Sequence, residues 1–570
     1  MMKKVVLVET TQPSAPIRPF EPTTAQLKAP IVRKGALVFC AIGYILCILT
    51  TIAPLYKMVG IQTRLWISNA IIKAADWLHL PADLGLTANH YISLQQTSFL
   101  EFLLLMLLAF AIPWLCVYLL QRAGTQSDYT FALCLIWLTV LLSGCLYLFT
   151  PAMFSDDVYS YASYGRLLSV HHASPYVIPP SAYPHDPTFK LVHWKDTVSI
   201  YGPLWIVISA VIGLVSGPDR LGYLIAFRLC AFAAHLLNTW LVTATLRTMG
   251  HPARTVALST LLYAWNPLIL FESSLGGHND VFMVTFLLLG LLFSARAERS
   301  GATRLRDAIP ALVAFTFAAL VKLTAIPIIV FFILKLFWST YDTTTSTADA
   351  VKPNHAGRCR TALSAASFAS IISLGISLAC YVPFWLGYSI QQIFTSFSSQ
   401  PTAHYQFNSI LAAMSVWNSA HGLPTFLALF NSRSVWVAIT IFAFVLTMGI
   451  GAIWLRRVPT TSTVALATLT VLAAFLLITP WFLSWYVTWL VGLAAVCLPV
   501  AHDRPGRALI VLALTFSASA FLSYYYVSIA WSLPLYVTSY VMLCLATFGM
   551  PLLALLSYLS LPKRHSLSHS

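Results

Sequence analysis

Long stretches of nearly uncharged residues recur along the chain, from residue 35 to residue 559, and they constrain the fold more than any other feature. An α-helix needs about 20 such residues to cross a bilayer, because it rises only about 1.5 Å per residue. With 58% apolar and 9% charged residues, the chain has too little polar surface for a soluble protein of 570 residues. Because lipid offers no partner to a bare backbone amide, the sequence predicts an all-α, polytopic membrane protein.

The hydropathy pattern predicts 13 to 14 transmembrane helices. The candidate spans are 35–56, 99–121, 129–150, 221–246, 254–272, 279–296, 307–322, 324–339, 362–386, 434–455, 461–479, 482–500, 507–527 and 534–559. The two segments that flank Lys322 are the least clearly separated. The apolar segment 203–217 is too short and glycine-rich for a crossing, so we expect a re-entrant or surface-lying helix there. The segment 404–429 gives no clear expectation.

The positions of lysine and arginine set the expected orientation. Most of the 33 basic residues fall in the same alternate loops, for example in ARAERSGATRLR at 295–306, and cytoplasmic loops accumulate such residues. Both termini are therefore predicted to be cytoplasmic and the loop after residue 150 extracytoplasmic. The tails, 1–34 and 561–570, are predicted to be disordered around one transmembrane domain at 35–560. Attraction to an anionic inner leaflet explains the net charge of +15, so no nucleic acid partner is expected.

The longest polar segment, the predicted outer loop 151–202, holds two adjacent carboxylates, Asp156 and Asp157, directly after a span. A loop of this length usually has a function. If a helix begins here, Tyr161 and Tyr164 lie one or two turns from Asp157 on one face. Two interpretations of the acidic pair remain open at this point: a helix cap favoured by the dipole, or a catalytic pair.

A second polar cluster follows the span at 254–272. Gly276 and Gly277 permit a close approach of the backbone, and His278, Asn279 and Asp280 open the next predicted helix. A helix start with free amides beside a glycine turn is suited to bind phosphate. The alternative is a tight turn and a cap with no ligand.

Ionisable residues inside the apolar segments are a third signal. Arg228, Glu272 and Lys322 each lie in or near a predicted span, where an uncompensated charge costs about 3 kcal/mol or more. A partner or ligand is therefore expected for each. Snorkelling to the interface is an alternative for Lys322, which lies at a span end, more than for Arg228.

Taken together, five motifs resemble a known family. SDDVYSYASYGRLL at 155–168 is followed by SPYV, YGPLW, WNPLILFESSLGGHND and TPWFLSWYVTWLV. In this order, over residues 130–500, they resemble the GT-C superfamily of membrane glycosyltransferases. The most similar branch is the bacterial polyprenyl-phosphate-mannose-dependent α-1,6-mannosyltransferases.

The resemblance implies a GT-C fold in a bacterial plasma membrane and an inverting hexosyl transfer, with mannose as the expected sugar. The implied partners are a polyprenyl-phosphate sugar donor and a glycan or glycolipid acceptor on the extracytoplasmic face. Asp156 or Asp157 would be the general base, with Asp156 slightly favoured. No cofactor and no metal are expected. The implied substrate-binding side chains are Tyr161, Arg166, Tyr201, Arg228, His278, Asn279, Asp280, Lys322, Trp485 and Tyr486.

Other interpretations compete with this one. A secondary transporter or a flippase for lipid-linked sugars also has many spans and buried charges, and an envelope-polymer ligase shares an outer site. A metal held by His171, His185, His193 and an Asp is conceivable, although their spacing fits no standard ligand pattern. The outer segment 57–98, which is possibly amphipathic, has no counterpart in the resemblance.

Overall fold

The computed structural model describes residues 24–78, 90–123, 125–217, 219–301, 305–343, 355–398, 406–501, 503–524 and 536–561. Within these residues every regular element is helical, apart from two isolated β-bridges, Gly60–Ala152 and Phe407–Trp481. Eleven of the described helices are long and apolar enough to cross a membrane. The predicted all-α, polytopic fold is therefore confirmed.

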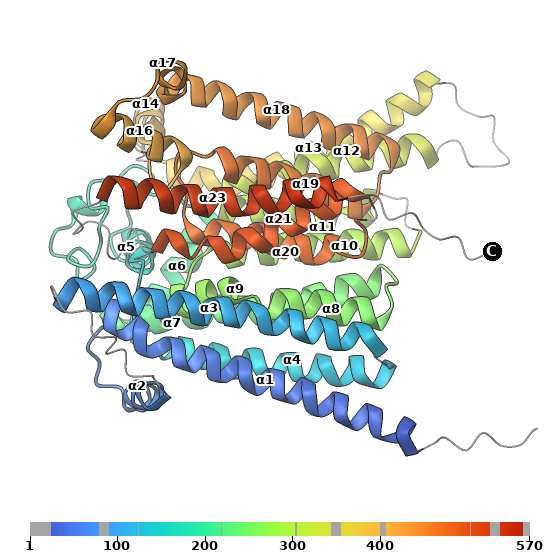
Figure 1. Ribbon diagram of the computed structural model, residues 1–570. Helices are drawn as coiled ribbons and strands as arrows, with labels where there is room; N and C mark the ends of the chain where they lie inside the picture. The colour runs from blue at the N-terminus through green and yellow to red at the C-terminus, as the bar shows by residue number, and fades with distance from the viewer. Residues whose placement is uncertain are drawn as a thin grey trace, which may run out of the picture.

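The long helices are α1 (Thr24–Val59), α3 (His90–Ala123), α4 (Gln126–Leu148), α7 (Arg220–Thr248), α10 (Asp280–Arg299), α12 (Ile326–Thr343), α13 (His355–Trp385), α18 (Arg433–Arg457), α19 (Thr461–Ile478), α21 (Arg504–Ser519) and α23 (Tyr536–Ser560). They run side by side in one bundle, as Figure 1 shows. The apolar faces of α13 and α18 are mostly exposed, whereas α10 and α21 are mostly buried. Helices α13 and α18 therefore lie at the outside of the bundle, and α10 and α21 lie near its centre.

Three predicted spans are shorter than a full crossing. The segment 254–272 is α8 (Ala253–Ala264) followed by α9 (Pro267–Phe271), 307–322 is α11 (Leu305–Val321), and 482–500 is η5 (Ser484–Val487) with α20 (Thr488–Cys497). Asn266 and Pro267 interrupt the first, because Asn266 caps α9 with its side chain. Eleven of the 14 candidate spans thus coincide with a described helix that is long and apolar enough to cross a membrane, and these three do not.

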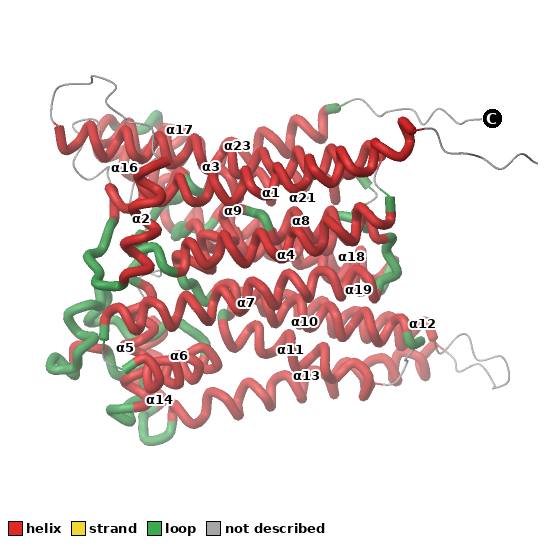
Figure 2. Tube along the Cα trace, turned by 90° about the horizontal axis from the view of Figure 1, so that it is seen from below, coloured by secondary structure: helices red, strands yellow, loops and turns green. Residues whose placement is uncertain are grey.

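The two ends of the bundle differ. In both views, α5 (Asp157–Ser169) and α6 (Pro203–Ser216) lie at one end of the bundle, and the last turns of α12 and the first turns of α13 lie at the other (Figures 1 and 2). The start of α1 and the end of α23 are also at this second end. The expected surface-lying segment 203–217 is thus a 14-residue helix that packs on α5.

The remaining short elements lie mainly at the α5 end. They are α2 (Trp66–Leu78), η1 (Pro180–Ala182), α14 (Ile390–Ser398), α16 (Ile410–His421), α17 (Thr425–Ala428) and η4 (Leu429–Asn431), together with η2 (Glu272–Gly276) and η3 (Leu323–Ala325) inside the bundle. Helix α1 begins at Thr24, earlier than the predicted start at residue 35. The other parts of the predicted tails, residues 1–23 and 562–570, lie outside the described residues.

Candidate active site

The acidic pair stands at the start of α5, at the end of the bundle away from the start of α1 and the end of α23. Asp156 has the N-cap position but makes no capping bond with its side chain. Ser155 Oγ accepts from the Asp157 amide at 3.3 Å instead. Tyr161, one turn later, donates its hydroxyl to Asp157 Oδ2 at 3.4 Å, as the helical spacing predicted. The Asp156 carboxylate therefore does not cap α5 by a hydrogen bond.

Asp157 borders two neighbouring cavities. The larger one, the His193 cavity, has a volume of about 340 Å³ and also contains Asp156. The smaller one, the Lys322 cavity, has a volume of about 60 Å³. Trp194, Trp481 and Trp485 line both. One carboxylate thus faces two adjoining spaces that share aromatic walls.

Burial changes the acid–base behaviour of the pair. Desolvation raises the pKa of Asp157 to about 6, with Asp156 adding to the increase and with His278 and Lys322 opposing it. Desolvation also raises the pKa of Asp156, and His193 opposes this increase. A carboxylate with a pKa of about 6 is ionised at neutral pH yet is a stronger base than an ordinary aspartate.

Trp485, which lines both cavities, packs against His278 of the segment that follows Gly276 and Gly277. His278 stacks on the Trp485 ring, with ring centroids 3.9 Å apart and planes 14° apart. His278 Nδ1 lies 2.8 Å from Glu272 Oε2, and Tyr524 donates its hydroxyl to Glu272 Oε1 at 2.6 Å. Glu272, whose partner the sequence left open, is therefore paired with His278 and Tyr524.

Gly276 and Gly277 leave room for this packing, because neither has a side chain. A Cβ on Gly276 would lie 2.4 Å from His278 Nδ1, and Gly277 has φ +70° beside the backbone of Arg228. The close approach that the sequence predicted is thus to neighbouring protein atoms. His278, Asn279 and Asp280 are all buried, and none of them lines either cavity. They form a layer behind the cavity walls, which differs from the direct contact with phosphate or sugar that we expected.

Lys322 connects that buried layer to the smaller cavity. Its Nζ donates to Asp280 Oδ1 at 2.7 Å, and Trp489 Nε1 donates to the same oxygen at 2.6 Å. The ammonium lies 4.2 Å from the centre of the Tyr486 ring. Lys322 is placed by a break in the helix, since α11 ends at Val321 and Lys322 itself is extended.

Gly202 of the YGPLW motif fixes this break. Its amide donates to the carbonyl of Val321 at 3.1 Å. A Cβ on Gly202 would lie 1.9 Å from the carbonyl oxygen of Leu320, so only glycine fits against the end of α11. Tyr201, next to it, lines the Lys322 cavity and meets the Tyr161 ring edge-on at 4.9 Å. The Tyr161 hydroxyl also lies 3.4 Å from Asn279 Oδ1, so its one hydrogen is shared between Asp157 and Asn279.

The two arginines that were expected to bind substrate lie outside both cavities. Arg228 is fully buried and donates to the carbonyls of Leu275, Thr150 and Ala152. It thereby holds the chain before Asp156 against the glycine turn. Arg166 forms an ion pair with Asp186 at 3.0 Å, and neither arginine lines a cavity next to Asp157.

Several residues at the site were not predicted for it. His193 and Trp194 come from the outer loop, Trp481 from the TPWFLSWY motif, and Tyr164 from α5, and all line the cavities. Trp194 and Trp481 have ring centroids 6.0 Å apart. Their position could not be inferred, because nothing in the spacing relates residue 194 to residue 481. Among the described residues, no group of three or more His, Cys, Asp or Glu side chains could hold a metal ion.

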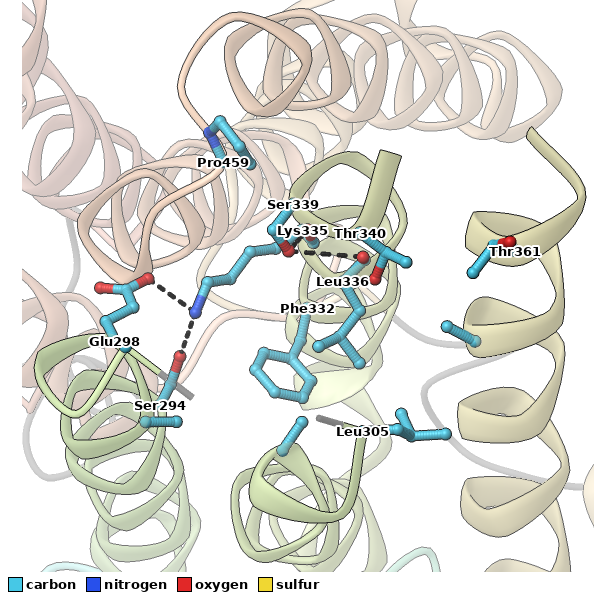
Figure 3. A pocket seen from close by; sticks show the side chains of 14 residues that line it. Ser294, Glu298, Leu305, Phe332, Lys335, Leu336, Ser339, Thr340, Thr361 and Pro459 are labelled. Atoms are coloured by element: carbon cyan, nitrogen blue, oxygen red, sulfur yellow. Dashed lines mark hydrogen bonds and ion pairs between the residues drawn. The ribbon is translucent and has the colours of Figure 1, made fainter. Parts of the chain in front are cut away.

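Another cavity is at the opposite end of the bundle. It has a volume of about 390 Å³ and lies between the ends of α10, α11, α12 and α13. Figure 3 shows Lys335 reaching across it to Glu298 and Ser294. Lys335 Nζ has three acceptors, Glu298 at 2.6 Å, Ser294 at 2.7 Å and Thr461 at 3.2 Å. The three ammonium hydrogens are thus used within the protein.

The fold and the site together define a multi-pass membrane protein whose partly buried carboxylate, paired cation and aromatic walls lie near one end of the bundle. Comparison with known proteins then narrows the class. Residues 59–338 match the family described as "Alpha-(1->6)-mannopyranosyltransferase, N-terminal domain". The chain is similar to "Alpha-(1->6)-mannopyranosyltransferase A" of Mycobacterium tuberculosis, with 26% identity over 38% of each chain.

Two further relatives have similar names. The "Probable alpha-(1->6)-mannopyranosyltransferase" of Mycolicibacterium smegmatis is 28% identical over 33% of each chain. "Alpha-(1->6)-mannopyranosyltransferase A" of Corynebacterium glutamicum is 26% identical over 26% of this chain and 30% of the relative. The chain thus spans only 30% to 38% of the length of these three relatives. These findings confirm the resemblance to a GT-C-like mannosyltransferase family.

Proposed function

We propose that this chain is an inverting mannosyltransferase that moves mannose from a polyprenyl phosphate to a glycan or glycolipid acceptor. The observation that carries the proposal is the position of Asp157 between two cavities, one of which contains Lys322. A transfer reaction needs two substrates to meet at one base. The names of the relatives support mannose as the sugar and an α-1,6 bond as the product.

Asp157 is the proposed general base. It takes the proton from an acceptor hydroxyl while that oxygen attacks the anomeric carbon of the donor sugar. The bond from that carbon to the phosphate oxygen breaks, and its electron pair leaves with the phosphate, so the configuration inverts. The resemblance slightly favours Asp156, but Asp156 borders only the larger cavity. Asp157 borders both, and Tyr161 orients it.

Lys322 is the proposed stabiliser of the departing phosphate. Its ammonium is fixed by Asp280 on one side and by the Tyr486 ring on another, and it lines the cavity that also contains Asp157. A cation held in place before the reaction stabilises the developing charge without reorganising. A phosphate leaves already ionised, so no general acid is needed.

The His193 cavity is the proposed acceptor site. Its walls include Trp194, Trp481 and Phe407, whose flat faces suit a sugar ring, and the carboxylate of Asp156 can accept from sugar hydroxyls. The positions of the basic helix ends support an extracytoplasmic site. Arg122, Arg247, Arg254 and Arg456 all belong to helix ends away from α5.

The test is a comparison of asparagine variants of the full chain in lipid vesicles. The donor is radiolabelled polyprenyl-phosphate-mannose and the acceptor a short mannan. We expect Asp157→Asn to lower the transfer rate by roughly 10²–10⁴-fold, as is typical when a general base is lost. Asp156→Asn should have a smaller effect. Asp196→Asn is the matched control, because Asp196 is exposed in the same loop and borders neither cavity.

Two results would contradict the proposal. If Asp157→Asn retained the wild-type rate, Asp157 would not be the base. If the wild-type chain moved the labelled lipid across the bilayer without transferring its sugar, the chain would be a flippase, which is the competing class.

A further inference from the structure

Helix α2, in the outer segment for which the resemblance had no counterpart, presents an unusual surface. Trp66 and Trp77 are 78% and 84% exposed, although tryptophan is normally buried in large part. They are eleven residues apart, which is close to three helical turns, so they lie on one face about 16 Å apart. Lys73 lies on the same face between them and is also exposed.

The opposite face of α2 is fixed to the protein. Ser68 and Ala75 are buried, and α2 packs on α1. Ser68 Oγ donates to the carbonyl of Phe149, at the end of α4, at 2.7 Å. The exposed tryptophans are therefore on the free side of a helix that is itself firmly attached.

The direction of α2 matches that of a membrane surface. Figure 1 views α2 along its axis beside the end of α1, and Figure 2 shows it running across the direction of the long helices. It lies at the end of the bundle where α5 begins. A helix perpendicular to the spans at their end lies in the plane of the lipid headgroups.

The charges near α2 suit phosphate groups. Arg64 and Lys73 are exposed, and Asp76 is the one acidic residue of the helix. Tryptophan beside lysine or arginine is the composition typical of segments at the membrane–water interface. Two cations against one carboxylate favour a surface that carries negative charge.

We propose that α2 binds an anionic phospholipid surface, with Trp66 and Trp77 between the headgroups and with Arg64 and Lys73 against lipid phosphates. This contact also reaches the catalytic segment. The Ile61 amide donates to the carbonyl of Pro151 at 2.7 Å, and the Met153 amide donates to the carbonyl of Val59 at 3.1 Å. Contact with the lipid thereby fixes how far the segment that leads to Asp156 lies from the membrane surface. The proposal concerns lipid contact and holds whichever reaction the site performs.

Photo-crosslinking of the full chain tests the proposal. A benzophenone amino acid replaces Trp66 or Trp77, one position at a time, in vesicles of radiolabelled phosphatidylglycerol and phosphatidylcholine. Leu104, exposed on the α3 span, is the lipid control, and His185, exposed in the outer loop, is the water control. We expect lipid adducts at positions 66 and 77 within about twofold of position 104, and roughly tenfold above position 185.

The charge is tested with the Arg64→Gln, Lys73→Gln double variant. We expect the yield at position 77 to fall about threefold or more in anionic vesicles and to stay unchanged in phosphatidylcholine alone. The yield at position 104 in the same background shows that the fold is intact. Adduct yields at 66 and 77 no higher than at 185 would overturn the proposal, and so would adducts to a second copy of the chain. An unchanged yield in the charge variant would overturn the anionic preference.

Discussion

Replacing Lys322 with methionine separates its contribution to the fold from its proposed part in the chemistry. Asp280 is fully buried, and its Oδ1 accepts from Lys322 and from Trp489. Lys322→Met leaves that carboxylate without a counterion, which costs about 3–5 kcal/mol when one partner of a buried pair is removed. Adding Asp280→Asn removes the stranded charge. We therefore expect the double variant to recover most of the lost stability.

Activity should not recover in the same way. If Lys322 stabilises the departing phosphate, Lys322→Met lowers the transfer rate by roughly 10²–10³-fold, and the double variant stays as slow. The measurements are the free energy of unfolding by denaturing detergent and the transfer rate per folded molecule. The second uses labelled polyprenyl-phosphate-mannose at saturating donor.

Lys335 supplies the matched control. It is a buried lysine paired with Glu298 at 2.6 Å, but it lies at the other end of the bundle. Lys335→Met should also destabilise the protein while leaving the rate per folded molecule unchanged. Recovery of activity in the Lys322→Met, Asp280→Asn variant would refute the reasoning, because Lys322 would then act only by neutralising Asp280.

Three further outcomes are expected. Because the pKa of Asp157 is raised to about 6 and the base must be ionised, kcat/KM should fall tenfold per pH unit below about 6. Tyr161→Phe removes a hydrogen bond that stabilises the ionised carboxylate, so it should raise the pKa of Asp157 and shift this part of the pH profile to higher pH. Arg228→Met removes the donor to the buried carbonyls of Leu275 and Ala152 and one of two donors to that of Thr150, so it should lower the free energy of unfolding by about 2 kcal/mol or more in detergent titrations. Gly202→Ala forces the end of α11 away and should lower the melting temperature through a strain of about 1–3 kcal/mol, whereas Gly375→Ala, with open space around it, should be neutral.

The long helices and the contacts of the acidic pair within α5 could be predicted from the sequence, because each depends only on residues that are close together in the chain. A helix that crosses lipid needs a continuous apolar run, so the eleven long helices are visible without any tertiary information. The Asp157–Tyr161 contact follows from the spacing of one helical turn. The aromatic walls around the pair could not be predicted, because Trp194, Trp481 and Trp485 come from segments far apart in the chain.

The sequence identifies the buried charges but not the groups that pair with them. The sequence indicated that Arg228, Glu272 and Lys322 need partners, and each has them in the structure. Whether a partner is a ligand or another part of the protein depends on side-chain geometry, which hydropathy does not encode. The carbonyls at the end of α4 satisfy Arg228, so its charge serves the fold. Lys322 also borders a cavity, so its charge is available to a substrate.

The breaks in the interrupted apolar segments lie close to the candidate active site. Helix α8 stops before Asn266, α11 stops before Lys322, and η5 begins only after Leu483. Irregular backbone at membrane depth is tolerated only where protein or a water-filled space surrounds it. An interrupted apolar segment therefore predicts a polar cavity beside the break. Two of these breaks, at Lys322 and at Leu483, border the Lys322 cavity, and the third precedes the turn that carries His278. The hydropathy pattern predicts these three segments as spans, so the breaks themselves became visible only in the structure.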